Sequence, residues 1–209
     1  PFYLMAYVDG KIYKNPSLPG LTPDERRKVY HAMNKTIAKI HSVDVHKAGL
    51  ADYGKLDGSY VKRQVKTWSR QYEASKTEEI EAMNKVMDWL PKNVPPQTKD
   101  SVVHGDYRVD NLIYDKTDPE KVLAVLDWEL STLGHPYADL AYQCLQWHLP
   151  KMGITPGLDE IDTRKLGIPS EEDYIRSYCK KMSIDNIRNW SFYLAFGFFR
   201  IAGIAQGVY

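Results

Sequence analysis

The sequence predicts an α+β fold that is mostly helical and carries a small β hairpin. Apolar residues recur at helical spacing in long segments near both ends of the chain. Between these segments, residues 102–126 hold short apolar runs separated by turn residues, which is typical of strands. The chain has 209 residues, 43% of them hydrophobic, and a formal net charge of +1. This composition is that of an ordinary globular protein, and it gives no electrostatic reason to expect nucleic acid.

The chain opens on an apolar segment. Residues 2–8 are predicted to form a strand, and Asp9-Gly10 a turn after it. The segment starts without a methionine, and the chain ends within an apolar helical pattern. We therefore expect that both ends were cut from something longer.

Three helices are expected in the first half. Thr22-Pro23-Asp24-Glu25 forms a capping box with proline at the first helical position, so a helix should follow and run to His41. A second helix is expected from about Ser59 to Tyr72. A third is expected to start at Thr77, and Pro91 ends it.

The second half is predicted to begin with strands and to end with helices. Expected strands cover 102–103, 111–114 and 121–126, and the last two form a hairpin about the turn at 115–119. The later elements are a helix from Pro136 through Leu149, a loop over 150–169, a helix capped by Ser170, and a strongly apolar helix from about Ile184 to the end.

Two features exclude other classes of protein. Cys144 and Cys179 are the only cysteines and lie far apart, so we expect two buried thiols rather than a disulfide framework or a zinc site. No apolar run approaches the roughly 18 residues of a membrane span.

The most informative polar residues lie at the ends of the predicted strands. Asp106 and Asn111 flank one short loop, and Asp127 ends the return strand of the hairpin, so the three side chains can converge. Phosphoryl transfer from a nucleotide–magnesium complex needs a carboxylate to orient the attacking hydroxyl and hard oxygen ligands for the metal. Each residue alone is better explained as an ordinary turn or cap residue. Together they favour a metal–phosphate site.

The pattern His-x-Asp-x4-Asn, followed by an aspartate at a strand end, resembles the catalytic loop of protein-kinase-like enzymes. Its His-Gly-Asp form, with Gly105 in the second position, is similar to the aminoglycoside phosphotransferase and choline kinase group. The resemblance implies that Asp106 is the catalytic base and that Asn111 and Asp127 hold Mg²⁺.

The same resemblance suggests roles for three neighbours. Arg108 stands where many kinases place a lysine that contacts the transferring phosphate, and a guanidinium would suit that contact. His104 is expected to hold the loop by packing and hydrogen bonding rather than to act in catalysis. Asp139 resembles an aspartate that supports the catalytic loop from below, although an ordinary acid in the first turn of a helix would look the same.

A narrower resemblance covers nearly the whole chain. Segments 63–77 and 125–136 resemble the phosphotransferase-like domain that precedes the dehydrogenase modules of acyl-CoA dehydrogenase family members ten and eleven. This resemblance implies an ATP-dependent kinase that acts on a hydroxyl, plausibly that of a hydroxylated acyl-CoA, next to a fused dehydrogenase domain. It also implies an intracellular protein of the mitochondrion or peroxisome, and the cytoplasm stays open as an alternative.

The chain departs from a complete kinase in its first residues. It contains no Gly-x-Gly motif, and its start resembles the hinge strand that follows an N-terminal lobe. We therefore expect residues 1–10 to be that hinge strand, with the backbone of Met5, Ala6 and Tyr7 facing the adenine, and residues 11–209 to be the helical C-terminal lobe. Such a fragment should bind ATP weakly, because the nucleotide would meet only half a cleft. It should also turn over little, because positioning supplies most of the catalysis in phosphoryl transfer.

Two other functions stay open at this point. The chain could be a non-catalytic kinase-like module that binds a ligand or docks a dehydrogenase domain. It could also be a metal-dependent hydrolase that uses Asp106, Asp127 and His104, although such sites generally offer more ligands. The acceptor pocket is expected among the later helices. Candidate wall residues are Trp147, His148, Trp190, Tyr193 and Phe196, although most of them are better explained as ordinary core aromatics.

Overall fold

The computed structural model describes residues 6–97, 99–151 and 155–208. Its α-helices are α1 (Pro23–His41), α2 (Tyr60–Ser75), α3 (Glu81–Trp89), α4 (Pro136–Cys144), α5 (Thr163–Leu166), α6 (Glu171–Met182) and α7 (Trp190–Val208). Its strands are β1 (Ser101–Val103), β2 (Leu112–Tyr114), β3 (Val122–Val125) and β4 (Thr132–Gly134). Short 3-10 helices are η1 (Leu90–Lys92), η2 (Val109–Asn111), η3 (Trp128–Leu130) and η4 (Leu145–Trp147). The α+β prediction is confirmed.

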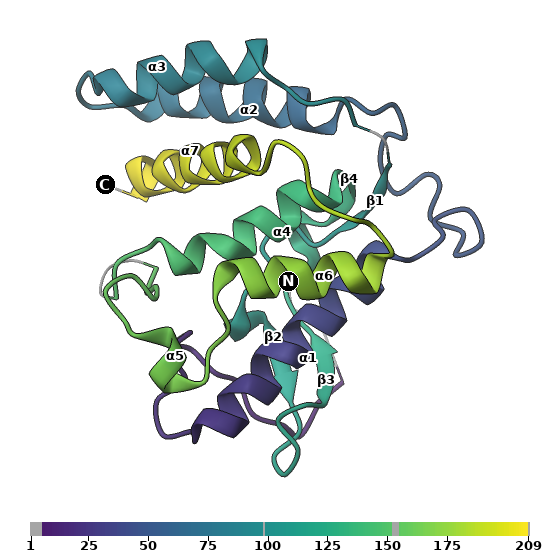
Figure 1. The fold of residues 1–209 in the computed structure, drawn as a ribbon. Coiled ribbons are helices and arrows are strands. Elements are labelled where there is room, and N and C mark those ends of the chain that lie inside the picture. The colour runs from purple at the N-terminus through teal and green to yellow at the C-terminus, as the bar shows by residue number, and fades with distance from the viewer. Residues whose placement is uncertain (1–5, 98, 152–154, 209) are drawn as a thin grey trace.

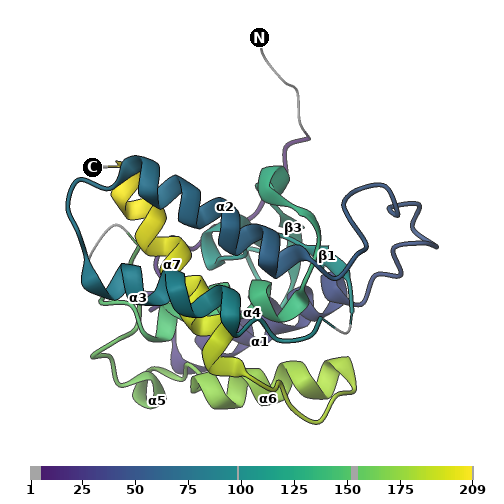
Figure 2. The same cartoon turned by 90° about the horizontal axis from the view of Figure 1, so that it is seen from above.

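Helix α7 lies between two layers of helices. It packs against α4 on one side and against α2 and α3 on the other. Figure 2 shows the α2–α3 pair stacked over α7 when the molecule is seen from above. Helix α1 packs against α6 and against β1 on the far side of α4. The central position of α7 explains its apolar sequence, because a helix covered on several faces has no wide polar face.

The strands form two separate antiparallel pairs. β2 and β3 make the predicted hairpin, in which Leu112 faces Val125. β1 pairs with β4, so that Ser101 faces Gly134. The sequence did not predict β4, because its three residues carry no alternating pattern and their partner strand is far away in the chain. These two pairs hold the loops between them in place.

Helix α1 starts as the capping box predicts. The backbone N–H of Thr22 donates to Glu25 Oε2 at 2.7 Å, and the N–H of Glu25 donates to Thr22 Oγ1 at 3.3 Å. The predicted buried thiols are also confirmed, since Cys144 and Cys179 are both free and buried.

Two predicted helix starts are wrong. Helix α3 begins at Glu81 rather than Thr77, because Ile80 before it has an extended backbone (φ −109°, ψ 107°). Helix α7 begins at Trp190 rather than Ile184, because Asn189 has a left-handed backbone (φ 57°) that no right-handed helix can contain. The predicted loop 150–169 also holds the short helix α5.

The predicted N-terminal strand is only partly described. Residues 2–5, and with them Met5, lie outside the described residues. Ala6, Tyr7 and Val8 form no strand, and Tyr7 is exposed. The first pairing of the described chain is a single bridge between Lys11 and Tyr114 of β2. Among the described helices, none combines the length and apolar character needed to cross a bilayer.

Candidate active site

Asp106 and Asn111 lie together on the loop between β1 and β2. Asn111 Nδ2 donates to the backbone carbonyl of Asp106 at 2.8 Å and to Asp106 Oδ2 at 3.2 Å. These bonds fix the orientation of the amide and leave Asn111 Oδ1 as the atom that could bind a cation. Both side chains are half-buried at the loop rim.

Asp127 reaches the same region through the hairpin. The backbone N–H of Leu126 donates to the carbonyl of Asn111 at 2.8 Å, which extends the β2–β3 pairing by one residue. Asp127 follows at once with a left-handed backbone (φ 62°, ψ 59°) and an exposed side chain. Non-glycine residues of this conformation cluster at functional sites, where the surrounding structure enforces them. The hairpin thus places Asp127 one residue beyond the backbone pairing of Leu126 with Asn111.

His104 joins the loop to the end of β3. Its Nδ1 accepts the backbone N–H of Asp106 at 3.2 Å, and its Nε2 donates to the carbonyl of Leu126 at 2.7 Å. The ring is fully buried against Tyr107 and Trp128. Because both ring nitrogens are occupied inside the loop, His104 has none left to bind a metal. This geometry opposes the hydrolase hypothesis.

Asp139 holds the loop from the side of α4. Its carboxylate accepts the backbone N–H of His104 at 2.7 Å and that of Gly105 at 2.9 Å, and it contacts His41 Nε2 at 3.2 Å. The side chain is almost completely buried. Burial by itself would raise the pKa of Asp139, but the His41 ring and the two N–H donors outweigh it and hold the pKa below its usual value of 3.8.

Gly105 has the backbone conformation that its place between His104 and Asp106 requires. Its φ is +86°, and a Cβ atom on it would lie 2.6 Å from the carbonyl oxygen of Leu130. A larger residue would therefore face both backbone strain and a steric clash. The glycine between histidine and aspartate, which marks this site in the sequence, is therefore needed for steric reasons.

Arg108 is held by a neighbour. Its Nε donates to Asp110 Oδ1 at 3.0 Å and its second terminal nitrogen donates to Asp110 Oδ2 at 2.7 Å, as a bidentate pair. Both side chains are about 30% exposed, at 32% and 29%. The predicted contact of Arg108 with a transferring phosphate would have to use its remaining N–H groups or displace Asp110.

A pocket of about 420 Å³ opens beside Asp106. Its wall is mainly apolar and comes largely from α7 and from the chain after α4. Its lining residues are Asp106, Arg108, Leu130, Tyr142, Leu149, Pro150, Thr155, Arg200, Ile201, Ile204 and Ala205. The pocket lies next to the candidate base, and a mainly apolar wall with a few polar groups is typical of small-molecule sites.

Sequence reasoning missed Tyr142 and Arg200 in this wall. Burial raises the pKa of Tyr142 to about 12; the Asp106 carboxylate acts in the same direction and Arg200 opposes it. Tyr142 is therefore within reach of both charges. Two signals were present in the sequence: Tyr142 follows Asp139 by one helical turn, and Arg200 is a lone cation within an apolar run.

The aromatic residues that were expected as candidate walls lie elsewhere. Tyr193 and Phe196 are buried in the main core. Trp147 packs against Tyr30 and Tyr174. His148 and Trp190 both contact Glu171. None of these residues lines the pocket at Asp106.

The oxygen atoms of the loop fit a magnesium–phosphate complex. Asn111 Oδ1 and the Asp127 carboxylate are hard ligands, and Mg²⁺ in nucleotide sites commonly takes one or two protein ligands and completes its shell with phosphates and water. Across residues 6–97, 99–151 and 155–208 there is no cluster of three or more His, Cys, Asp or Glu side chains that could hold a metal unaided. Asn111 Oδ1 and the Asp127 carboxylate are thus a donor set that Mg²⁺ accepts.

Comparison with known proteins identifies the family. The model of the phosphotransferase enzyme family matches residues 1–161. Acyl-CoA dehydrogenase family member 10 of Mus musculus is 54% identical over the whole chain, and family member 11 of Rattus norvegicus is 43% identical. A crystal structure of a candidate aminoglycoside phosphotransferase from Ralstonia eutropha is 48% identical over 97% of this chain, with a TM-score of 0.92.

This chain belongs to the phosphotransferase enzyme family and has its kinase-like fold. The chain spans 20% of the mouse protein, 27% of the rat protein and 61% of the Ralstonia chain. The predicted resemblance to aminoglycoside phosphotransferases and to acyl-CoA dehydrogenase family members ten and eleven is confirmed.

Proposed function

We propose that this chain provides the catalytic residues of an ATP- and Mg²⁺-dependent phosphotransferase that acts on a hydroxyl of a small molecule. The observation that carries the proposal is the contact of Asn111 with Asp106, to which the β2–β3 hairpin adds Asp127. A base and two oxygen ligands thereby share one rim, next to a pocket.

Each residue has a distinct task in this proposal. The Asp106 carboxylate orients the acceptor hydroxyl and receives its proton. Asn111 Oδ1 and the Asp127 carboxylate hold the cation, while Asp139 and His104 fix the backbone that carries Asp106. Arg108 is proposed to contact the transferred phosphate. Mg²⁺ would neutralise the charge that develops on the phosphate oxygens.

The nucleotide side is proposed from the same resemblance. The backbone around Met5, Ala6 and Tyr7 would face the adenine, with residues 1–10 as hinge and residues 11–209 as the C-terminal lobe. A mitochondrial or peroxisomal location belongs to this proposal too.

For the acceptor we propose a hydroxylated acyl-CoA. Support comes from the names of the relatives, which are acyl-CoA dehydrogenases, and from the mostly apolar wall of the pocket beside Asp106. In the complete protein, a dehydrogenase domain would then receive or supply the same acyl group.

The test uses the complete natural protein with radiolabelled ATP, magnesium and a panel of hydroxylated acyl-CoAs. Transfer of label to at least one acceptor is expected, together with its loss in Asp106→Ala and in Asp127→Ala. Glu129→Gln is the matched control, because Glu129 is an exposed acid two residues beyond Asp127. Transfer that persists in both alanine variants would contradict the proposal.

A second candidate function is a kinase-like module that docks a dehydrogenase domain without catalysis. The names and lengths of the relatives favour it. A thermal shift of the complete protein with magnesium and ATP separates the two functions: a shift that requires magnesium supports the kinase, and no shift supports the docking module.

A further inference from the structure

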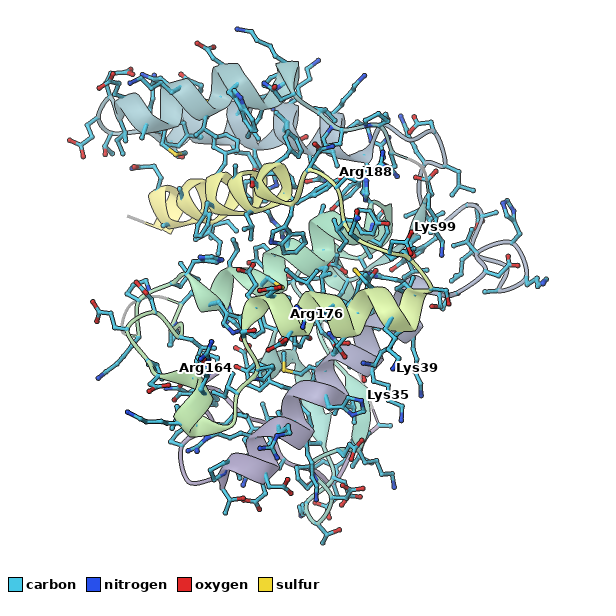
Figure 3. All side chains as sticks on the ribbon, viewed as in Figure 1. Lys35, Lys39, Lys99, Arg164, Arg176 and Arg188 are labelled. Carbon is cyan, nitrogen blue, oxygen red and sulfur yellow. The ribbon has the colours of Figure 1, made fainter. Side chains whose placement is uncertain are left out.

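Arg200 of α7 is a buried cation. It is 7% exposed and is the one arginine or lysine in the buried class within the described part of the chain. Exposed cations elsewhere are solvated: Figure 3 labels six on the outer surface, namely Lys35, Lys39, Lys99, Arg164, Arg176 and Arg188. A cation taken out of water is costly unless an anion or several hydrogen-bond acceptors compensate it.

No such compensation is present among the described residues. The arginines with a carboxylate partner there are Arg27, Arg63, Arg108 and Arg176. Arg200 is not one of them, and its buried Nε has no hydrogen-bond partner. Its guanidinium therefore keeps donors free to bind a further acceptor group.

Two aromatic rings hold the guanidinium of Arg200 instead. Its centre lies 4.4 Å from the ring centroid of Tyr142 and 5.4 Å from that of Trp68. Such cation–π contacts contribute on the order of 0.5–2 kcal/mol each and restrict the side chain. They attract the charge but do not replace the hydrogen bonds that an anion would accept. The rings thus hold the guanidinium of Arg200 in place and leave its N–H groups available to an acceptor.

The same arginine faces the place where the acceptor is expected. Arg200 and Asp106 line one pocket, and Tyr142 lies within the influence of both. Arg108, the second arginine of that wall, is already neutralised by Asp110. A molecule whose hydroxyl meets Asp106 would therefore present another part of itself to a positive charge that has no ion-pair partner among the described residues.

We propose that Arg200 binds an anionic group of the acceptor and selects for it. The acceptor class would be hydroxylated molecules with an apolar body and either a carboxylate or a phosphate group. A guanidinium suits both anions, because it can donate two parallel hydrogen bonds to either. A polycationic acceptor would instead place like charges side by side. This inference rests on the proposed function, since it concerns the acceptor of that reaction.

The test measures kcat/KM of the complete natural protein, with ATP and magnesium, for three matched series of acceptors. The series are hydroxyoctanoic acids with the hydroxyl at successive carbons, their uncharged methyl esters, and their CoA thioesters. Preference for the acid over the ester identifies a carboxylate as the ligand of Arg200. Preference for the thioester over both identifies the CoA phosphates. Equal kcat/KM for the ester and both anions overturns the inference while the proposed function stands.

Variants assign the preference to Arg200. Arg200→Met should raise KM for the preferred anion by about 10- to 100-fold, the loss expected for a charge-assisted hydrogen bond, and should leave the ester unaffected. Arg200→Lys, which keeps the charge without the planar fork, should fall between the two. Arg188→Met is the control, because Arg188 is an exposed cation (Figure 3) and should change nothing.

Calorimetry of the binding of the same acids and thioesters, without ATP, tests the anion site at Arg200 separately from the phosphotransferase function. If no acceptor is phosphorylated but an anion binds to the natural protein and not to Arg200→Met, the anion site stands and the proposed function fails. Anion binding that is equal in the natural protein and in Arg200→Met overturns the inference. Absence of both binding and transfer overturns both proposals.

Discussion

The buried carboxylate of Asp139 accepts the backbone N–H of His104 at 2.7 Å, so a helix on one side of the molecule fixes the first residue of the candidate catalytic loop. The second carboxylate oxygen accepts the N–H of Gly105, at 2.9 Å. His41 of α1 contacts the same group, and its other ring nitrogen contacts Tyr178 of α6. Three helices thereby meet at the carboxylate that holds the loop.

Asp139→Asn should loosen this loop. The amide can accept only one of the two backbone bonds and turns a donor toward the other, which leaves a buried N–H without a partner. The expected cost is roughly 1–3 kcal/mol. Hydrogen exchange of the complete protein should show faster exchange in peptides covering residues 101–108, and Asp24→Asn, a change at an exposed surface acid, should not. Unchanged exchange in Asp139→Asn would contradict the proposed support.

The low pKa of Asp139 predicts a pH dependence. Because the folded pKa lies below the unfolded value of 3.8, its stabilising contribution is complete above pH 3.8 and is lost as the pH falls through the folded pKa. Protection of residues 101–108, measured by hydrogen exchange and corrected for the intrinsic rates, should therefore decline below pH 3.8. Asp139→Asn should lack this decline; a decline of the same size in the variant would assign it to another group.

The lowered pKa of His135 predicts a second pH dependence of stability, at milder pH. Burial, together with the charge of His41, lowers the pKa of His135 from 6.5 to about 4. The unfolded chain therefore takes up a proton that the folded chain refuses, and stability should fall as the pH drops from 6.5 to about 4. The size of this loss is roughly 3 kcal/mol, from the difference between the two pKa values.

His135→Asn tests that assignment. Asparagine keeps an acceptor at the start of α4, where His135 Nδ1 accepts the N–H of Tyr137, and it does not titrate. The unfolding temperature of the variant, followed by calorimetry, should vary less between pH 6.5 and 4 than that of the natural protein. His46→Asn, at an exposed histidine, is the control. Equal pH dependence in the natural protein and in His135→Asn would contradict the assignment.

Gly105→Ala should damage the site through two effects. The left-handed backbone at φ +86° strains alanine, and the new methyl group would meet the carbonyl of Leu130 at 2.6 Å. Gly20→Ala is a matched control, because Gly20 has φ +85° with open space around it. Both variants should lose stability from strain, and Gly105→Ala should lose more, along with phosphoryl transfer. Equal losses in thermal unfolding would show that the contact with Leu130 has no influence.

Local signals in the sequence predicted much of this fold. The capping box at Thr22 placed the start of α1, and the alternation of apolar runs and turns placed the β2–β3 hairpin. The starts of α3 and α7 were missed, because the backbone conformations of Ile80 and Asn189 depend on their surroundings. β4 was missed because its pairing with β1 is set by the tertiary structure.

In the candidate site, too, the features set by local sequence were predicted and those set by tertiary packing were missed. Asp106 and Asn111 lie five residues apart on one loop, so their spacing already suggested that they meet. Arg200 and Tyr142 come together only because α7 packs against α4, and a lone cation in an apolar helix does not show which residues it will contact. The pairing of Arg108 with Asp110 was also missed. A guanidinium can bind a phosphate or a neighbouring carboxylate in the same way, so the sequence did not distinguish the two.

In the proposed mechanism Asp106 receives the proton of the acceptor hydroxyl, and the proposed function depends on this step. Its most direct test is kcat for phosphoryl transfer by the complete natural protein and by Asp106→Asn, at saturating magnesium and ATP, with the best acceptor found. Asparagine keeps the size of the side chain but cannot take up the proton, so kcat should fall by about 10²- to 10⁴-fold, while the magnesium-dependent thermal shift with ATP persists. A kcat within a few-fold of the natural value, with the same acceptor, would contradict the account.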